Sequence, residues 1–138
     1  MAANRLAFMR LIVVGTLISL GGCKHKSASD FTPASDKARA ALETALKSWK
    51  DGQQPGTVAG TSKPVVQIVD SEWSDGRKLT SYEIVNDEAP AGPGPRTFTV
   101  RLTTDNGKAR EVKYMVVGID PLLIYRDMDY DKLSGMSK

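Results

Sequence analysis

The chain contains one cysteine and one histidine, Cys23 and His25, which lie close together near its start. A nucleophilic side chain needs a base within hydrogen-bond reach, and the usual zinc sites need three or four His or Cys ligands. A single cysteine also excludes a disulfide within the chain. The glycine-rich loops that bind nucleotides are missing as well. We therefore expect no classical acyl-transfer site, no zinc site and no dissociable cofactor, and Cys23 needs another explanation.

The residues before Cys23 have the three parts of an export signal. Residues 1–10 carry two arginines and no acid, residues 11–20 form an uncharged apolar run, and Gly21 and Gly22 follow. This order is typical of a basic region, an apolar region and a small-residue cleavage site. The run from Leu11 to Gly22 has 12 residues, fewer than the roughly 20 that a membrane-spanning helix needs. The pattern favours a removable signal over a permanent transmembrane anchor.

Leu20-Gly21-Gly22-Cys23 resembles the lipobox of bacterial lipoproteins. The resemblance implies that a signal peptidase recognises Leu20, Gly21 and Gly22. It also implies that the thiol of Cys23 receives a diacylglycerol and that the new amine often receives an acyl chain. Several acyl chains anchor a protein durably, because each buried methylene contributes about 0.8 kcal/mol.

The lipobox places the chain in the bacterial cell envelope, with membrane lipid as a partner through Cys23. The residue after the cysteine is Lys24. It is not the aspartate that commonly keeps lipoproteins at the inner membrane. Outer-membrane delivery is therefore favoured if the cell has that sorting system.

The charge of the chain becomes nearly balanced once the signal is removed. The whole chain has 19 Lys and Arg against 16 Asp and Glu, and the loss of Arg5 and Arg10 leaves 17 against 16. A nearly neutral chain with scattered basic residues has no broad cationic surface to collect phosphates. We expect no nucleic-acid partner.

The sequence after the signal predicts a tether and one domain. In residues 35–50, apolar positions recur three and four apart, which predicts an amphipathic helix capped by Ser35 or Asp36 and stopped by Gly52. Single strands are predicted at residues 65–69, 78–85 and 122–126, and two paired runs at residues 96–118. The proline-rich residues 86–95 are predicted to form a mobile loop. The predicted parts are a signal peptide (1–22), a lipidated tether (23–34), a single domain (35–131) and a disordered tail (132–138).

The segment 96–118 contains two alternating runs around a central Asp-Asn-Gly. A two-residue turn would mix apolar and polar residues on each face of this hairpin. A three-residue loop with Gly107 in the left-handed region pairs Phe98 with Tyr114 and keeps one face apolar. We predict the second register.

One amphipathic helix followed by four or more antiparallel strands predicts an α+β fold with the helix packed on the sheet. The same order of elements occurs in cystatin-like and nuclear-transport-factor-2-like folds. Aromatic residues at periodic positions of these elements either fill the core or line a ligand pocket between helix and sheet. The candidate pocket residues are Trp49, Trp73, Tyr82, Phe98 and Tyr114.

Acidic side chains are closely spaced in two places: Asp70, Glu72 and Asp75, and Asp127, Asp129 and Asp131. The second group departs from the EF-hand calcium loop, since the sixth position is Lys132 and the twelfth is Lys138. We interpret both groups as solvated turn residues and expect no metal site. An enzyme built on this chain would need an acid-dependent mechanism around Asp70 or Glu72.

Several motifs of the mature chain are similar to uncharacterised secreted or lipid-anchored proteins of planctomycete bacteria. The motifs are residues 49–52 (Trp-Lys-Asp-Gly), 70–73 (Asp-Ser-Glu-Trp), 76–82 and 125–127 (Tyr-Arg-Asp). The resemblance implies an envelope setting and brings no known activity.

Three hypotheses for function follow from the sequence. The first is a non-enzymatic envelope lipoprotein, an accessory or interaction domain whose sheet edge or face binds another envelope protein. The second is a small-molecule binding domain with a pocket between helix and sheet, and the third is an enzyme with an acidic site. The lack of a classical catalytic set favours the first.

Overall fold

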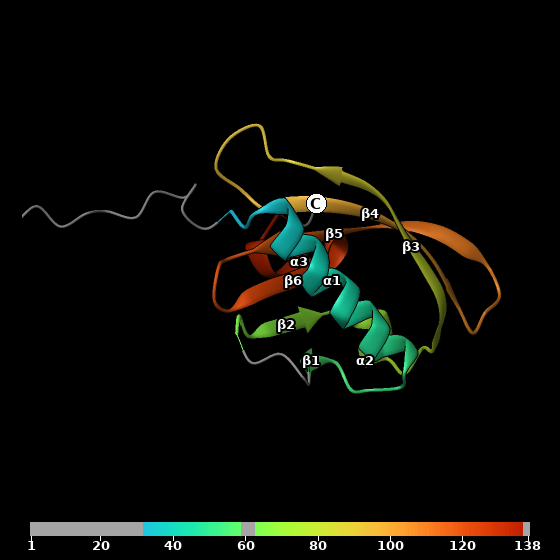
Figure 1. Cartoon of the computed structure of the whole chain (residues 1–138). Helices are drawn as coiled ribbons and strands as arrows, with labels where there is room; N and C mark the ends of the chain where they lie inside the picture. The colour runs from blue at the N-terminus through green and yellow to red at the C-terminus, as the bar shows by residue number, and fades with distance from the viewer. Residues whose placement is uncertain (1–31, 59–62, 137–138) are drawn as a thin grey trace, which may run out of the picture.

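The computed structural model describes residues 32–58 and 63–136. In these residues the chain forms three helices and one sheet of six strands (Figure 1), which confirms the predicted α+β class. In chain order the elements are α1 (Ser35–Lys50), β1 (Gly56–Thr57), β2 (Val66–Val69), α2 (Ser71–Ser74), β3 (Leu79–Glu88), β4 (Arg96–Thr104), β5 (Ala109–Val117), β6 (Leu122–Arg126) and α3 (Asp127–Ser134).

The strands are ordered β1-β2-β6-β5-β4-β3 across the sheet. Four of the neighbouring pairs are antiparallel, but β2 and β6 run parallel, with Ile68 opposite Ile124. The expectation of a purely antiparallel sheet is therefore wrong. After β2 the chain passes through α2, β3, β4 and β5 before β6 returns to pair with β2. Pairing between strands so far apart in the sequence leaves no local pattern from which it could be predicted.

Helix α1 crosses one face of the sheet and supplies about a third of the core residues in the described part of the chain (Figure 1). Its buried residues follow the predicted spacing: Ala38, Ala41, Leu42, Ala45, Leu46 and Trp49. Gly52 follows the helix with a φ of 82°, as expected of the residue that stops it. The predicted cap is wrong, because the N-cap residue is Ala34, which makes no side-chain capping bond. Ser35 lies inside the first turn, and its hydroxyl donates to the carboxylate of Asp87 on β3.

The face of the sheet beneath α1 supplies more than half of the core residues. Its buried side chains alternate with more exposed ones along β2, β4 and β6, as a sheet with one covered face requires. The predicted hairpin register is confirmed, since Phe98 pairs with Tyr114 and Gly107 has a φ of 77°. The buried strand residues include Val66, Ile68, Phe98, Val100, Leu102, Tyr114, Val116, Leu122 and Ile124.

Helix α3 packs on the opposite face of the sheet. The ring of Tyr130 meets the ring of Tyr125 edge-on, with 5.8 Å between centroids, and Tyr125 points away from α1 because its neighbours on β6 are buried on the α1 side. The helix continues to Ser134, so a disordered tail does not begin at residue 132. The strand β3 is also longer than expected, because residues 86–88, predicted as loop, pair with residues 97–99.

One glycine is required by both backbone conformation and space. Gly118, which follows β5, has a φ of 87°, and a Cβ at this position would come 2.5 Å from the carbonyl oxygen of Pro121. Gly107 also has a positive φ, but a Cβ there would meet no atom within 4 Å. A side chain is therefore excluded more strongly at Gly118.

Candidate functional site

The residues predicted to be recognised and lipidated lie outside the part of the chain that the structure describes: Leu20, Gly21, Gly22 and Cys23. The first residue that the structure describes is Thr32, whose hydroxyl donates to the carbonyl of Gly94 at 2.8 Å. In the described residues, no helix has the length and apolar character needed to cross a membrane.

The aromatic residues predicted to line one pocket lie in three different places. Phe98 and Tyr114 are fully buried in the core, and Tyr82 is half-buried on β3. Trp49 and Trp73 are brought together, with their rings stacked at 13° and their centroids 5.6 Å apart. The structure thus brings four of the five residues together as two separate pairs, Trp49 with Trp73 and Phe98 with Tyr114, and leaves Tyr82 apart from both.

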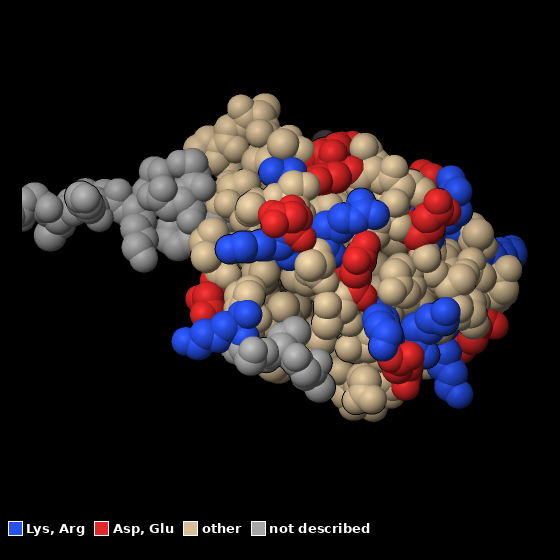
Figure 2. Space-filling model, in the orientation of Figure 1, with Lys and Arg blue, Asp and Glu red and all other residues tan. Residues whose placement is uncertain are grey.

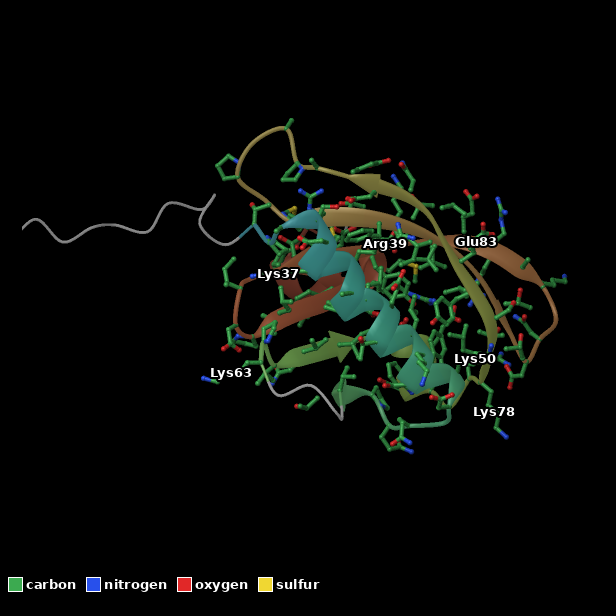
Figure 3. The ribbon with its side chains drawn as sticks, viewed as in Figure 1. Lys37, Arg39, Lys50, Lys63, Lys78 and Glu83 are labelled. Atoms are coloured by element: carbon green, nitrogen blue, oxygen red, sulfur yellow. The ribbon has the colours of Figure 1, made fainter. Side chains whose placement is uncertain are left out.

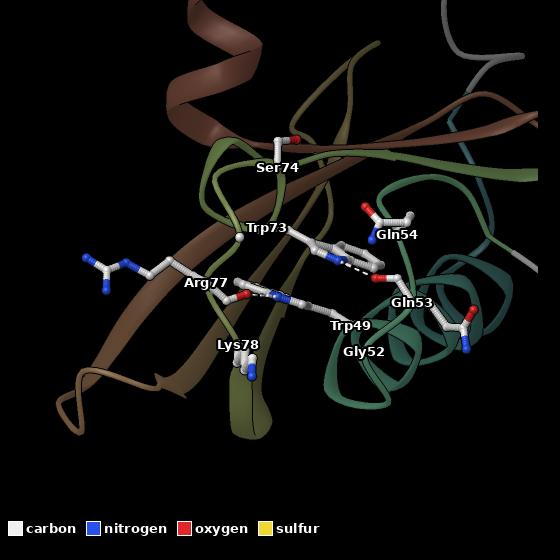
Figure 4. A pocket seen from close by; sticks show the side chains of 9 residues that line it. Trp49, Gly52, Gln53, Gln54, Trp73, Ser74, Arg77 and Lys78 are labelled. Atoms are coloured by element: carbon white, nitrogen blue, oxygen red, sulfur yellow. Dashed lines mark hydrogen bonds between the residues drawn. The ribbon is translucent and has the colours of Figure 1, made fainter.

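A cavity of about 210 Å³ lies beside the stacked indoles, between residues 52–54, which follow α1, and residues 74–78, which begin at the last residue of α2 (Figure 4). Both indole N–H groups are already used. That of Trp49 donates to the carbonyl of Arg77 at 2.7 Å, and that of Trp73 donates to the carbonyl of Gln53 at 2.8 Å. Ligand pockets usually enclose about 300–1,000 Å³. The stack therefore serves better to fasten two chain segments together than to hold a small molecule.

Asp70 is the centre of a buried polar network at the carboxyl end of β2, and it is 0% exposed. Its Oδ1 caps α2 by accepting the backbone N–H groups of Glu72 and Trp73 at 2.9 and 3.2 Å. Its Oδ2 accepts the hydroxyl of Tyr114 at 2.6 Å and lies 3.5 Å from Nε of Arg126. One carboxylate thus connects a helix start to two neighbouring strands.

Glu72 joins two arginines in the same network. Its Oε1 is 2.7 Å from Nη1 of Arg126, and its Oε2 accepts a hydrogen bond from Arg110. Burial alone would raise the pKa of Glu72, but the two arginines outweigh it and hold the pKa below its ordinary value. Burial, and then the charge of Asp70, raise the pKa of Tyr114 well above its ordinary value. Glu72 is therefore held as a charged partner of two arginines, which does not favour an acid–base role for this residue.

The interpretation of the acidic groups as solvated is wrong for Asp70 and for Asp129. Asp129 is 7% exposed and accepts the backbone N–H of Ser71 at 2.9 Å. These residues meet because β2 and β6 are parallel, so α2 and α3 begin at the same end of the sheet. No group of three or more His, Cys, Asp or Glu in the described residues is placed to hold a metal ion.

The edge of the sheet at β3 is the largest unpaired backbone surface among the described strands. β3 has ten residues and pairs only with β4, whereas the other edge strand, β1, has two residues. Its register against β4 is regular from residue 81 to 84 and shifts on either side, as at β-bulges. The outer backbone N–H and C=O groups of such a strand can pair with another chain.

A cavity of about 410 Å³ lies against this edge, where the last turn of α1 meets the start of β3. Lys47, Lys50 and Asp51 of the helix end and Ser81 and Tyr82 of the strand line it. Figure 3 shows Lys50 at this end of β3 and Glu83 farther along the strand. In the same view, Figure 2 shows several basic side chains around an acidic one at this end.

The chain matches no protein-family model, and no curated protein or solved structure is significantly similar to it. Function must then be argued from the sites themselves. Of the predicted pocket residues, Tyr82 is the one that lines the cavity at β3. Nothing in the sequence indicates a binding role for Lys50 or Ser81, because only the crossing of α1 over the end of the sheet brings them together.

Proposed function

We propose that the chain is a lipid-anchored envelope lipoprotein whose domain binds an extended segment of another envelope protein along β3. The observation that carries this proposal is a ten-residue strand that pairs on one side only among the described residues. A segment added to such an edge gains main-chain hydrogen bonds, and pockets beside the edge select its alternate side chains.

The anchor is proposed from the lipobox resemblance of residues 20–23, and it would keep the domain close to its partner at the membrane. The outer membrane is favoured if the cell sorts lipoproteins by the residue after Cys23. Within the α+β class, we propose a cystatin-like or nuclear-transport-factor-2-like layer, supported by a long helix that precedes the sheet and crosses it. A non-enzymatic role is supported by Asp70 and Glu72, whose carboxylates are already bound to arginines.

Two features of β3 make its edge selective. Edge strands invite indiscriminate pairing, and proteins limit this with bulges and charged side chains. β3 has register shifts on both sides of residues 81–84, and its Glu83 and Glu88 are exposed. A partner segment must therefore follow the local twist and tolerate the carboxylates.

Site-specific photo-crosslinking in the native cells tests this function. A photoreactive residue is placed at Val85 or Glu88 on β3, with Met128 on α3 as the control. Val85 and Met128 are 38% and 57% exposed. We expect one discrete adduct from the two β3 positions, joined to an extended segment of one envelope protein, and no adduct of that size from Met128. Equal adducts from all three positions, or none from β3, would contradict the proposal.

A further inference from the structure

We infer that the cavity at the start of β3 receives an acidic side chain of the added strand, from the residue that pairs opposite Tyr82. The inference rests on the proposed function, because it assigns a partner chemistry to the same edge. It commits the site to an extended peptide segment that carries a carboxylate on the side facing α1.

The position of this side chain follows from the alternation of the sheet. Tyr82 pairs with Leu102, whose side chain is buried beneath α1, so both point to the α1 side. Residues directly opposite one another on neighbouring strands point to the same face, with Cβ atoms about 5 Å apart. A residue paired with Tyr82 on its outer side therefore points toward α1, where the cavity of about 410 Å³ opens.

The charges around the cavity select a carboxylate. Nζ of Lys47 is 3.4 Å from Oδ2 of Asp51, so these two charges largely offset each other. Lys50 lines the cavity, and Lys78 directly precedes β3; both are exposed and form no ion pair with a described residue. The positive charges of these two lysines together exceed the partial negative charge at the C-terminal end of α1. A basic side chain would be repelled here, and a neutral one would leave the lysines unpaired.

Peptide binding to the full-length chain in detergent tests the inference. The probes are three seven-residue peptides with threonine at odd positions and valine, X and valine at even positions, where X is Glu, Gln or Lys. We expect the Glu peptide to bind about threefold more tightly than the Gln peptide, as for a partly exposed ion pair. The Lys peptide should bind more weakly than both.

Charge reversal in the protein should reverse this order. K50E should bind the Lys peptide best, and K50Q, which keeps Lys78, should bind the Glu peptide with a smaller preference over the Gln peptide than wild type shows. The matched control is K37E, an exposed lysine at the other end of α1, which should keep the wild-type order. Circular dichroism checks that each variant is folded. If K50E does not fold, the peptide preference of K50Q alone tests the inference.

Each other outcome has a defined meaning. Equal affinities for the Glu and Lys peptides would overturn the inference and leave strand addition in place. Failure of all three peptides to bind would contradict the inference and the proposed function together. A wild-type dimer in sedimentation that K50E dissociates would assign the edge to a second copy of the chain and overturn the inference.

Discussion

Replacement of Asp70 by Asn tests whether the buried network holds the carboxyl ends of β2 and β6 together. Asparagine keeps an oxygen that can cap α2, but it removes the charge that faces Nε of Arg126 at 3.5 Å. The guanidinium side chain is 4% exposed, and its Nη2 has no hydrogen-bond partner among the described residues. After the change, Glu72 alone balances Arg126 while also binding Arg110.

The expected loss of stability is about 3 kcal/mol, the low end of the range for breaking a buried ion pair, because Glu72 stays in place. In a domain of about 100 residues this lowers Tm by roughly 15 °C. D70A also loses the cap of α2, which adds about 1 kcal/mol. Y114F removes one hydrogen bond and should cost about 1 kcal/mol.

Chemical denaturation followed by circular dichroism at neutral pH measures these differences. The matched control is D75N, an exposed acid of the same group, which should stay within about 0.5 kcal/mol of wild type. If D70N unfolds at the same denaturant concentration as D75N, the charge of Asp70 does not support the fold and the reasoning is refuted.

Further predictions concern pH, the backbone, the aromatic stack and the lipid anchor. The pKa of Glu72 is lower in the fold than its ordinary value of 4.5, so its contribution to stability is present at neutral pH and is lost as pH falls below 4.5. Denaturation at a series of pH values should show that the free energy of unfolding falls less steeply with acid in E72Q than in wild type. By the same denaturation assay, G107A should cost about 1 kcal/mol, and G118A, which adds a backbone clash, about 3 kcal/mol. W73F should abolish the circular-dichroism signal of coupled indoles and destabilise the fold by about 1–2 kcal/mol; an unchanged spectrum would refute the stack. C23A should abolish incorporation of labelled palmitate, and unchanged labelling would overturn the anchor.

Structure that depends on neighbouring residues could be predicted from the sequence. The buried side of α1 was visible in the spacing of Leu42, Leu46 and Trp49, because helix periodicity is local. The β4–β5 register could be chosen because one register alone kept a single apolar face with Gly107 left-handed. Both predictions are confirmed.

Structure that depends on distant pairing could not be predicted. The parallel pairing of β2 with β6 joins strands separated by most of the domain, and it alone brings Asp70 to Arg126. The sequence does contain one local signal for this site, since Asp70 before Ser-Glu-Trp is a good N-cap for a short helix. The acids at the start of α3 were a similar signal, since acidic residues favour the first turn of a helix.

The candidate binding edge was also only partly visible in the sequence. The alternation of residues 78–85 predicted a strand, and Tyr82 was assigned to a pocket, but periodicity does not show which strand ends a sheet. The cavity beside the edge depends on where α1 crosses, so Lys50 gave no signal of its own.

Amide hydrogen exchange of the full-length chain, with and without the Glu peptide, tests strand addition at β3 most directly. Pairing on the outer edge should slow exchange at residues 81–84 and leave α3 unchanged. Slower exchange confined to α3 or to the tryptophan stack, with β3 unaffected by bound peptide, would contradict the account.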